Sequence, residues 1–302
     1  MDGAKFVIEA TEAEQMARDS GLSILQLLPT LLPSAQPLAR PPISKFQVAA
    51  AGLGSDGRIF LGVNLEFPGV PLHHSVHAEQ FLVTNLAVHG VPRLIAFAVS
   101  AAPCGHCRQF LQELRHASDD LRILIASDES PTFKPLSSLL PSPFGPFDLL
   151  DEKTPLLLEP HDNGLLIAAN ACNGECESDS DSKLEAAALE AANSSHVPYS
   201  GCPSGVALMD WEGNIYKGSY TESAAYNPSL GPVQAALVAY MAGGGGGYEK
   251  IVAGVLVEKE GVLVRQEDTA RLLLKLASPK CKLRVFHCVS ASTPKGRMKA
   301  SI

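Results

Sequence analysis

Residues 77–79 read His-Ala-Glu and residues 103–107 read Pro-Cys-Gly-His-Cys, and these two stretches decide the fold to be expected. His77, Cys104 and Cys107 offer an imidazole and two thiols, which are side chains that Zn²⁺ prefers. Three protein ligands leave the fourth tetrahedral position open, as in catalytic zinc sites, and a water there ionises near neutral pH. Glu79 is close enough in sequence to move the protons of that water. The two stretches therefore predict a hydrolytic zinc centre with Glu79 as its acid–base group.

The same residues allow two other interpretations. A closed structural zinc site would need a fourth ligand, and His73, His74 or His106 are candidates for it. A redox Cys-x-x-Cys pair is the second alternative, but it leaves His77 and Glu79 without a role. Arg108 is a candidate donor to a ligand sulfur.

The other cysteines carry weaker signals. Cys172 and Cys176 have ligand-like spacing, but no second Cys or His pair follows at the distance of a zinc finger. Cys202, Cys281 and Cys288 lie on or beside apolar runs and are expected to be ordinary core residues.

Composition limits the classes of function. The 302 residues are 46% hydrophobic and 19% charged, which suits a globular protein of two domains. The net charge is −8, and the only basic cluster is the weak tail of Lys295, Arg297 and Lys299, so a nucleic-acid partner is not expected. No apolar stretch approaches the roughly 18 residues of a membrane helix. The beginning of the chain lacks the features of a signal or transit peptide, and unpaired cysteines favour a reducing compartment, so a cytoplasmic location is expected.

The hydrophobic pattern alternates between helical and extended periods. Helices are expected over 11–18, 24–28, 75–89, 103–114 and 183–192. Ser23 is expected to cap the second of these helices and Pro29 to end it, and Ser75 is expected to cap the third. Strands are expected over 46–53, 59–63, 94–100 and 121–126, with a loop over 33–42. This order predicts an α/β fold, a mixed sheet with helices on both faces in three α/β/α layers, preceded by a small helical N-terminal region.

The second half of the chain repeats the first weakly, at an offset of 156 residues. The run 56–60, Asp-Gly-Arg-Ile-Phe, faces the run 212–216, Glu-Gly-Asn-Ile-Tyr. The same register places Val233 opposite His77, Ala235 opposite Glu79 and Glu260 opposite Cys104. We therefore expect a duplicated fold whose second copy has no reactive groups. The expected division is a helical region over 1–40, a catalytic domain over 41–160, a linker with a connecting helix over 161–195 and a degenerate domain over 196–302.

Three segments together resemble the cytidine deaminases: residues 64–67 (Asn-Leu-Glu-Phe), 77–80 (His-Ala-Glu-Gln) and 103–110 (Pro-Cys-Gly-His-Cys-Arg-Gln-Phe). The chain is most similar to the long, homodimeric type, which has one catalytic and one degenerate half. Residues 144–146 and the stretch 198–228 also match that type. A shorter, tetrameric class has a third cysteine where this chain has His77.

This resemblance implies roles for the matched residues. Asn64 and Glu66 would bind the ribose 3′-hydroxyl, and Phe46 would pack against the nucleoside. The backbone of Ala78 would help to read the pyrimidine, and Phe144 would reach into the active site of the partner subunit.

The resemblance also implies an activity. It is hydrolytic deamination of cytidine and 2′-deoxycytidine to uridine and 2′-deoxyuridine with release of ammonia, a reaction of pyrimidine salvage. The implied cofactor is a single Zn²⁺ in each subunit, and the implied partners are a small nucleoside and a second copy of the chain, with no nucleic acid and no membrane. Two alternatives remain: a deaminase of nucleotides or of bases within RNA or DNA, and a zinc-stabilised binding protein without activity.

Overall fold

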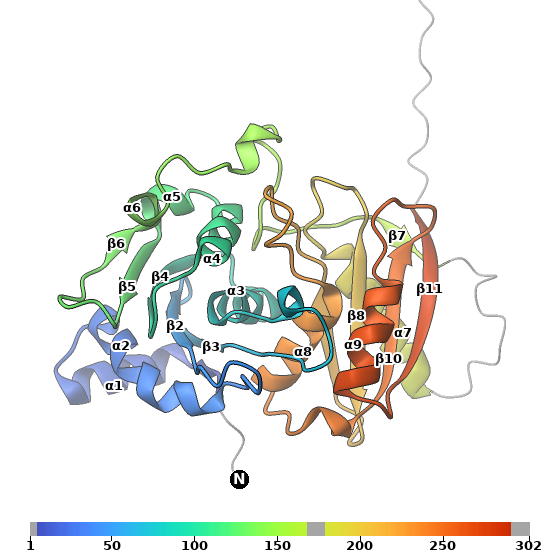
Figure 1. Ribbon diagram of the computed structural model, residues 1–302, viewed down its shortest axis with the longest axis horizontal. Helices are drawn as coiled ribbons and strands as arrows, with labels where there is room; N and C mark the ends of the chain where they lie inside the picture. Colours follow the sequence, from blue (N-terminus) through green and yellow to red (C-terminus); the bar gives the residue numbers. More distant parts are fainter. Residues whose placement is uncertain (1–4, 168–178, 291–302) are drawn as a thin grey trace, which may run out of the picture.

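The chain folds into two halves, each built on one mixed β-sheet (Figure 1). The computed structural model describes residues 5–167 and 179–290. In these residues the strands are β1 (Val7–Ile8), β2 (Ala49–Gly54), β3 (Ile59–Val63), β4 (Leu94–Val99), β5 (Arg122–Ile125), β6 (Lys134–Pro135), β7 (Leu165–Leu166), β8 (Ser204–Asp210), β9 (Ile215–Ser219), β10 (Ile251–Lys259) and β11 (Lys282–Ser290). The α-helices are α1 (Ala10–Ser20), α2 (Ile24–Ala35), α3 (Ala78–Val88), α4 (Gly105–Phe110), α5 (Ala117–Asp120), α6 (Leu136–Leu139), α7 (Asp179–Asn193), α8 (Pro232–Ala242) and α9 (Glu267–Ala277). Single 3₁₀ turns are η1 (Gln36–Leu38), η2 (Leu72–His74), η3 (Leu111–Glu113), η4 (Pro146–Asp148) and η5 (Tyr248–Lys250).

The two sheets share the topology of four strands each, β3-β2-β4-β5 and β9-β8-β10-β11. The first has the order β1-β3-β2-β4-β5-β6, and the second has the order β7-β11-β10-β8-β9. The hairpins β2–β3 and β8–β9 are antiparallel, and each is followed by an antiparallel neighbour and then by a parallel pair, β4–β5 or β10–β11. The predicted mixed sheet and its duplication are confirmed.

Helices cover both faces of each sheet. In the first half α2 packs against β2 and β4, while α3 packs against β3 and β2; in the second half α7 and α8 take the corresponding places on β8 and β9. α3 and α8 contact one another between the two sheets, at the centre of the molecule (Figure 1). The first turn of α3, which carries the His-Ala-Glu stretch, is therefore close to the second half.

The offset between the halves changes at the central helices. Gly62 on β3 and Gly218 on β9 keep the expected offset of 156 residues. A Cβ on Gly62 would meet the Ala78 carbonyl at 2.3 Å, and one on Gly218 would meet the Pro232 carbonyl at 2.3 Å, so the offset between α3 and α8 is 154. The predicted register was wrong by two residues here because the connection into α8 is shorter.

The corrected register changes the residues that replace the reactive groups. Gly231 is the N-cap of α8 as His77 is of α3, and Val233 stands where α3 has Glu79. Likewise Gln266, not Glu260, is the N-cap of α9. None of the three replacing residues offers an imidazole, thiol or carboxylate, so the expected loss of the reactive groups still holds at these positions.

We predict that Gly62→Ala separates the first sheet from α3. The new Cβ would lie 2.3 Å from the Ala78 carbonyl and 2.6 Å from the Leu82 nitrogen, both of them backbone atoms of α3 that cannot rotate away. We expect the free energy of unfolding to fall by about 3 kcal/mol in urea titrations. Gly145→Ala is the control, because nothing lies within 4 Å of its Cβ position. Equal urea midpoints for the two variants would show that β3 and α3 are not in this close contact.

Pro29 does not end the second helix, contrary to expectation. Ser23 caps α2 as predicted, with Gln26 N donating to its Oγ at 3.3 Å, but the helix continues through Pro29 and Pro33. The reason is the buried face formed by four leucines: Leu27, Leu28, Leu31 and Leu32. Burial contributes about 1.5–3 kcal/mol for each leucine. Together these contributions offset the roughly 3 kcal/mol that each interior proline costs.

Neither the N-terminal region nor the expected linker helix is separate from the sheets. β1 pairs with β3, and α2 packs on the first sheet. α7, expected to be a connecting helix, buries Leu184, Ala188 and Ala192 in the core of the second sheet. Its alanines allow this close approach, which an alanine-rich pattern alone does not distinguish from an exposed helix. The pair Cys172 and Cys176 and the basic tail lie outside the described residues.

None of the helices within residues 5–167 and 179–290 has the length and apolar character needed to span a membrane.

Candidate active site

The His-Ala-Glu stretch lies at the start of α3. Ser75 is not the helix cap, because Val76 still pairs with Leu65 through hydrogen bonds of 2.8 and 2.9 Å and keeps the chain extended there. His77 is the N-cap instead, and its backbone N–H donates to Gln80 Oε1 at 3.2 Å. This bond and the Val76 pairing fix the position of the His77 imidazole at the N-terminus of α3.

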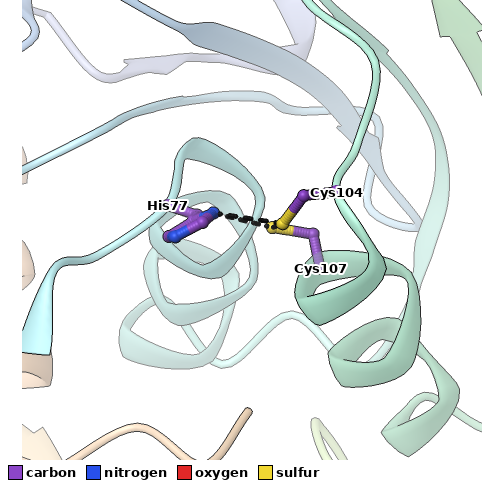
Figure 2. A group of neighbouring side chains, drawn as sticks. All are labelled: His77, Cys104 and Cys107. Atoms are coloured by element: carbon purple, nitrogen blue, oxygen red, sulfur yellow. Dashed lines mark hydrogen bonds between the residues drawn. The ribbon is translucent and has the colours of Figure 1, made fainter. Parts of the chain in front are cut away.

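The two cysteines lie at the start of α4 and face His77 (Figure 2). Cys104 is the N-cap of α4 and Cys107 lies in its first turn. The Nδ1 atom of His77 lies 3.5 Å from Cys104 Sγ and 3.3 Å from Cys107 Sγ, and the two sulfurs are 3.8 Å apart. In a tetrahedron of zinc ligands these separations would be about 3.5 Å for nitrogen to sulfur and about 3.8 Å for sulfur to sulfur. The donor triangle therefore has the dimensions that Zn²⁺ requires.

The charge state of the cysteines also suits a dication. The hydrogen bond from the Cys107 thiol, together with the His77 imidazole, lowers the pKa of Cys104 to about 3. The same sulfur–sulfur bond, with burial, raises the pKa of Cys107 well above its usual range. Cys107 thus keeps its proton where Cys104 loses it, and a doubly charged ligand is what would stabilise both sulfurs as thiolates.

Glu79 points into the same site. It is only 4% exposed, and its Oε2 atom lies 3.2 Å from Cys107 Sγ. Burial raises the pKa of the Glu79 carboxyl. Glu79 is not one of the three donors whose atoms lie within 4.8 Å of one another. It is therefore placed beside the ligand triangle, where it can exchange protons with a group bound there.

No fourth side-chain ligand joins the triangle among the described residues. His106 stacks on the His77 ring at 4.9 Å between centroids without entering the donor set, and His73 and His74 are likewise not members of it. A closed structural site is therefore not supported. Arg108 donates to the carbonyls of Pro103 and Leu139, at 2.7 Å each, so the expected bond from Arg108 to a sulfur is wrong.

Glu66 anchors a tight turn over residues 43–46. Its Oε2 atom accepts from the backbone N–H groups of Ile43 and Ser44 at 2.9 Å each, and its Oε1 atom accepts from Ser44 Oγ at 2.5 Å. These hydrogen bonds, which burial only partly opposes, lower the pKa of the Glu66 carboxyl. The carboxylate is therefore anionic. Its Oε2 atom already accepts two hydrogen bonds, whereas its Oε1 atom keeps a lone pair for a further donor.

Asn64 holds the other end of this turn. Its Oδ1 accepts from Val48 N at 2.9 Å and its Nδ2 donates to the Phe46 carbonyl at 2.9 Å. These bonds present the Phe46 ring, which is 61% exposed, on the surface of the turn. Phe46 is thus not a core residue of the described fold, and its exposed ring is available to stack on a planar ligand.

The two remaining candidates for substrate binding, Ala78 and Phe144, differ from one another in burial. Ala78 is fully buried at the first position of α3, where the backbone N–H has no intrahelical acceptor. Phe144 is 48% exposed, and its carbonyl accepts from Gln109 Nε2 on α4. The ring of Phe144 is thus available to another molecule, not packed in the core.

The second half keeps the carboxylate turn without the metal donors. Glu222 accepts from the backbone of Tyr199 and Ser200 at 3.0 Å each, as Glu66 does from residues 43 and 44. Tyr220 and Cys202 replace Asn64 and Phe46 in the 156-residue register, and both are buried. The turn is therefore a structural feature of the fold, and within the described residues only the first half combines it with a triangle of one histidine and two cysteines.

A second group of metal-binding side chains is already neutralised. Glu258, Glu267 and His287 offer atoms within 4.8 Å of one another. Arg265 lies among them, at 3.3 Å from Glu258 Oε1, 3.0 Å from Glu267 Oε2 and 3.3 Å from His287 Nε2. Its guanidinium takes the place that a cation would occupy, so this group is an ion-pair cluster.

Comparisons with known proteins agree on one family. Two models described as the cytidine and deoxycytidylate deaminase zinc-binding region match residues 24–119 and 136–271. Cytidine deaminase 1 of Arabidopsis thaliana is 60% identical over 304 residues, which cover 96% of this chain and 100% of that protein. Cytidine deaminase of Serratia proteamaculans (strain 568) is 39% identical over 268 residues, 89% of this chain and 85% of that protein. The crystal structure of cytidine deaminase from Mycobacterium tuberculosis is 34% identical over 40% of this chain and 97% of that chain, with a TM-score of 0.35.

Proposed function

Because this chain belongs to the cytidine deaminase family, we propose that it replaces the 4-amino group of cytidine by oxygen, giving uridine and ammonia. The observation that carries the proposal is the triangle of His77, Cys104 and Cys107 with the Glu79 carboxylate 3.2 Å from one of its sulfurs. A zinc enzyme that hydrolyses an amine-bearing carbon needs three protein ligands and one separate proton carrier, and this site offers both.

His77, Cys104 and Cys107 would hold the ion, and a Zn²⁺ bound by them supplies a nucleophile by lowering the pKa of water. Glu79 does the proton transfers. It takes a proton from the attacking water, delivers it to N3 of the pyrimidine and then helps to protonate the leaving amine. Its burial keeps bulk water from competing for these protons.

The turn over residues 43–46 recognises the sugar. Glu66 has a lone pair on Oε1 for the ribose 3′-hydroxyl, and Asn64, two residues before it, holds the same turn through the Phe46 carbonyl. A carboxylate there rejects a ligand that brings no donor and repels a 3′-phosphate. The exposed ring of Phe46 stacks on the nucleoside, and the free N–H of Ala78 reads the pyrimidine edge.

A substrate panel tests this assignment. We expect turnover of cytidine and 2′-deoxycytidine, with CMP slower and a cytosine-containing oligonucleotide inert, because the net charge is −8 and Glu66 accepts only a free hydroxyl. Glu66→Gln should raise KM for cytidine by about tenfold, since a hydrogen bond to a charged group contributes about 1.5–3 kcal/mol. Faster turnover of the nucleotide or the oligonucleotide would favour the alternative deaminases. Zinc-loaded protein that is inert on all four compounds would favour the binding-protein alternative.

We also propose that two copies of the chain form the active enzyme. Phe144 is 48% exposed, and Phe147 and Leu149 beside it are 45% and 51% exposed, so this segment presents an apolar surface that a second copy could cover. In the dimer Phe144 would enter the site of the partner subunit. A sedimentation experiment that finds full activity in a monomer would refute the dimer.

A cytoplasmic location and a role in pyrimidine salvage complete the proposal. The site needs Cys104 and Cys107 as thiolates, which a reducing compartment preserves. Uridine and 2′-deoxyuridine are nucleosides that can be used again, so deamination recovers the pyrimidine ring.

A further inference from the structure

Glu113 is a fully buried carboxylate whose hydrogen-bond donors come from the other half of the molecule. It belongs to η3, directly after the helix that carries Cys107, and none of its surface is exposed. Tyr199 Oη donates to its Oε2 atom at 2.6 Å, and Ala224 N donates to its Oε1 atom at 2.7 Å. The Nε2 atom of His196, itself buried, lies 3.2 Å from Oε2.

These contacts are energetically important because the carboxyl group is fully buried. Removing the carboxylate would leave the Tyr199 hydroxyl and the Ala224 N–H without acceptors, and an unpaired buried donor is costly. Burial, followed by the hydrogen bond to Glu113, raises the pKa of Tyr199. Glu113 therefore links the two halves through directional bonds and not through packing alone.

The link continues to the other metal-binding helix. Ala224 belongs to the loop of residues 222–230, and in that loop the Pro228 carbonyl accepts from Gln80 Nε2 at 3.0 Å. Gln80 lies in the first turn of α3, and its Oε1 atom accepts from the His77 backbone at 3.2 Å. A continuous path therefore runs from η3 through the second half to the residue that carries the imidazole.

We propose that Glu113 is a positioning residue for the metal site. Through the 222–230 loop it fixes the start of α3, with His77 and Glu79, against the start of α4, with Cys104 and Cys107. The inference rests on the proposed function in one respect, that these three donors hold zinc. It also gives the second half a role, because its hydrogen bonds fix α3 and α4, which each supply part of the site, relative to one another.

Small displacements matter at such a site. The distances from a metal to its ligands stay within about 0.2 Å of their usual values. A shift of about 1 Å in a reacting group can lower the rate by about 10²-fold. Loss of the hydrogen bonds of Glu113 should therefore weaken zinc retention and slow the chemical step. Nucleoside binding should be weakened less, because the turn over residues 43–46 is not part of the hydrogen-bond path from Glu113 to Gln80.

The test compares Glu113→Ala with Glu258→Ala in the zinc-loaded full chain. Glu258 is a matched control: it is also buried, at 1% exposed, and accepts from Gln266 N at 2.8 Å, but it lies on neither helix of the site. In Glu113→Ala we expect zinc to pass to a chromogenic chelator about tenfold faster. Amide hydrogen exchange in the first turn of α3 should also be faster, and kcat for cytidine should fall about 10²-fold with KM changed less than about threefold. Glu258→Ala should lower the unfolding midpoint without these changes.

Two further variants keep the test decisive. Glu113→Gln retains an acceptor for Ala224 N–H and should recover most of the zinc retention. Gln80→Ala breaks the path at its other end without touching the buried carboxylate, so it serves if Glu113→Ala does not fold. Combined with Glu113→Ala, it should add little, since both changes break one path.

Equal zinc release and equal exchange in the Glu113→Ala and Glu258→Ala proteins would overturn the inference. These two readouts do not need cytidine turnover. A wild-type protein that holds zinc but does not deaminate cytidine would therefore refute the proposed function and leave the positioning role to be judged by zinc release and exchange.

Discussion

Glu79→Ala is expected to retain about one zinc per chain while its kcat for cytidine falls by about 10⁴-fold. The carboxylate lies beside the donor triangle but is not a member of it, so removing it leaves the three ligands in place. It is the acidic side chain that reaches the triangle, with Oε2 at 3.2 Å from Cys107 Sγ. Without it, both the deprotonation of water and the protonation of the ring lose their carrier.

Metal analysis and steady-state kinetics on the same preparation make this measurement. Glu267→Ala is a suitable control, because Glu267 also lies in the first turn of a helix, α9, but in the half without a site. Its kcat should stay within about twofold of the wild type. Zinc-loaded Glu79→Ala protein with ordinary turnover would exclude Glu79 as the proton carrier.

Cys104→Ala is expected to lose the metal itself. Cys104 is one of three donors, and its low pKa makes it the sulfur that is already a thiolate before a cation binds. With only His77 and Cys107 left, we expect zinc to fall well below about one ion per chain after dialysis, and activity to fall with it.

Cys281→Ala is the control for this second variant. Cys281 is half-buried and belongs to neither group of metal-binding side chains, and burial raises the pKa of its thiol to about 11. It should keep its zinc and its turnover. If the Cys104→Ala protein keeps full zinc through dialysis, the donor set must be different from the one proposed.

The proximity of the site residues could be predicted from chemistry and spacing. A thiol pair at i, i+3 places both sulfurs on one face of a helix start. A histidine followed closely by a carboxylate then supplies the third zinc ligand and the proton carrier. The structure brings His77, Cys104 and Cys107 within 4.8 Å of one another. The first hairpin and the buried strand after it were equally predictable, because the Gly-Asp turn and the apolar runs specify a hairpin followed by a buried strand.

Features that depend on tertiary packing could not be predicted. Pro29 signals a helix end, yet four buried leucines keep α2 intact around it. The register of the repeat failed at α8 because a two-residue difference in a connection is invisible without the contact between Gly218 and Pro232. α7 has the composition of an exposed helix, and only its place on the second sheet shows that it is core.

Glu113 shows the same limit at the level of function. In the sequence it follows an apolar helix pattern and resembles any solvent-exposed glutamate. Its donors, Tyr199 and Ala224, lie 86 and 111 residues away along the chain, so no local pattern connects them. Glu113 differs from an exposed glutamate in being buried by residues that are distant in the sequence, and residue type alone does not reveal this.

The most direct test of the central claim is ammonia release from cytidine by the purified zinc-loaded chain, measured before and after a chelator and again after zinc is restored. We predict turnover that disappears with the metal and returns with it. A chain that holds zinc yet releases no ammonia, or that releases ammonia equally well without zinc, would contradict it.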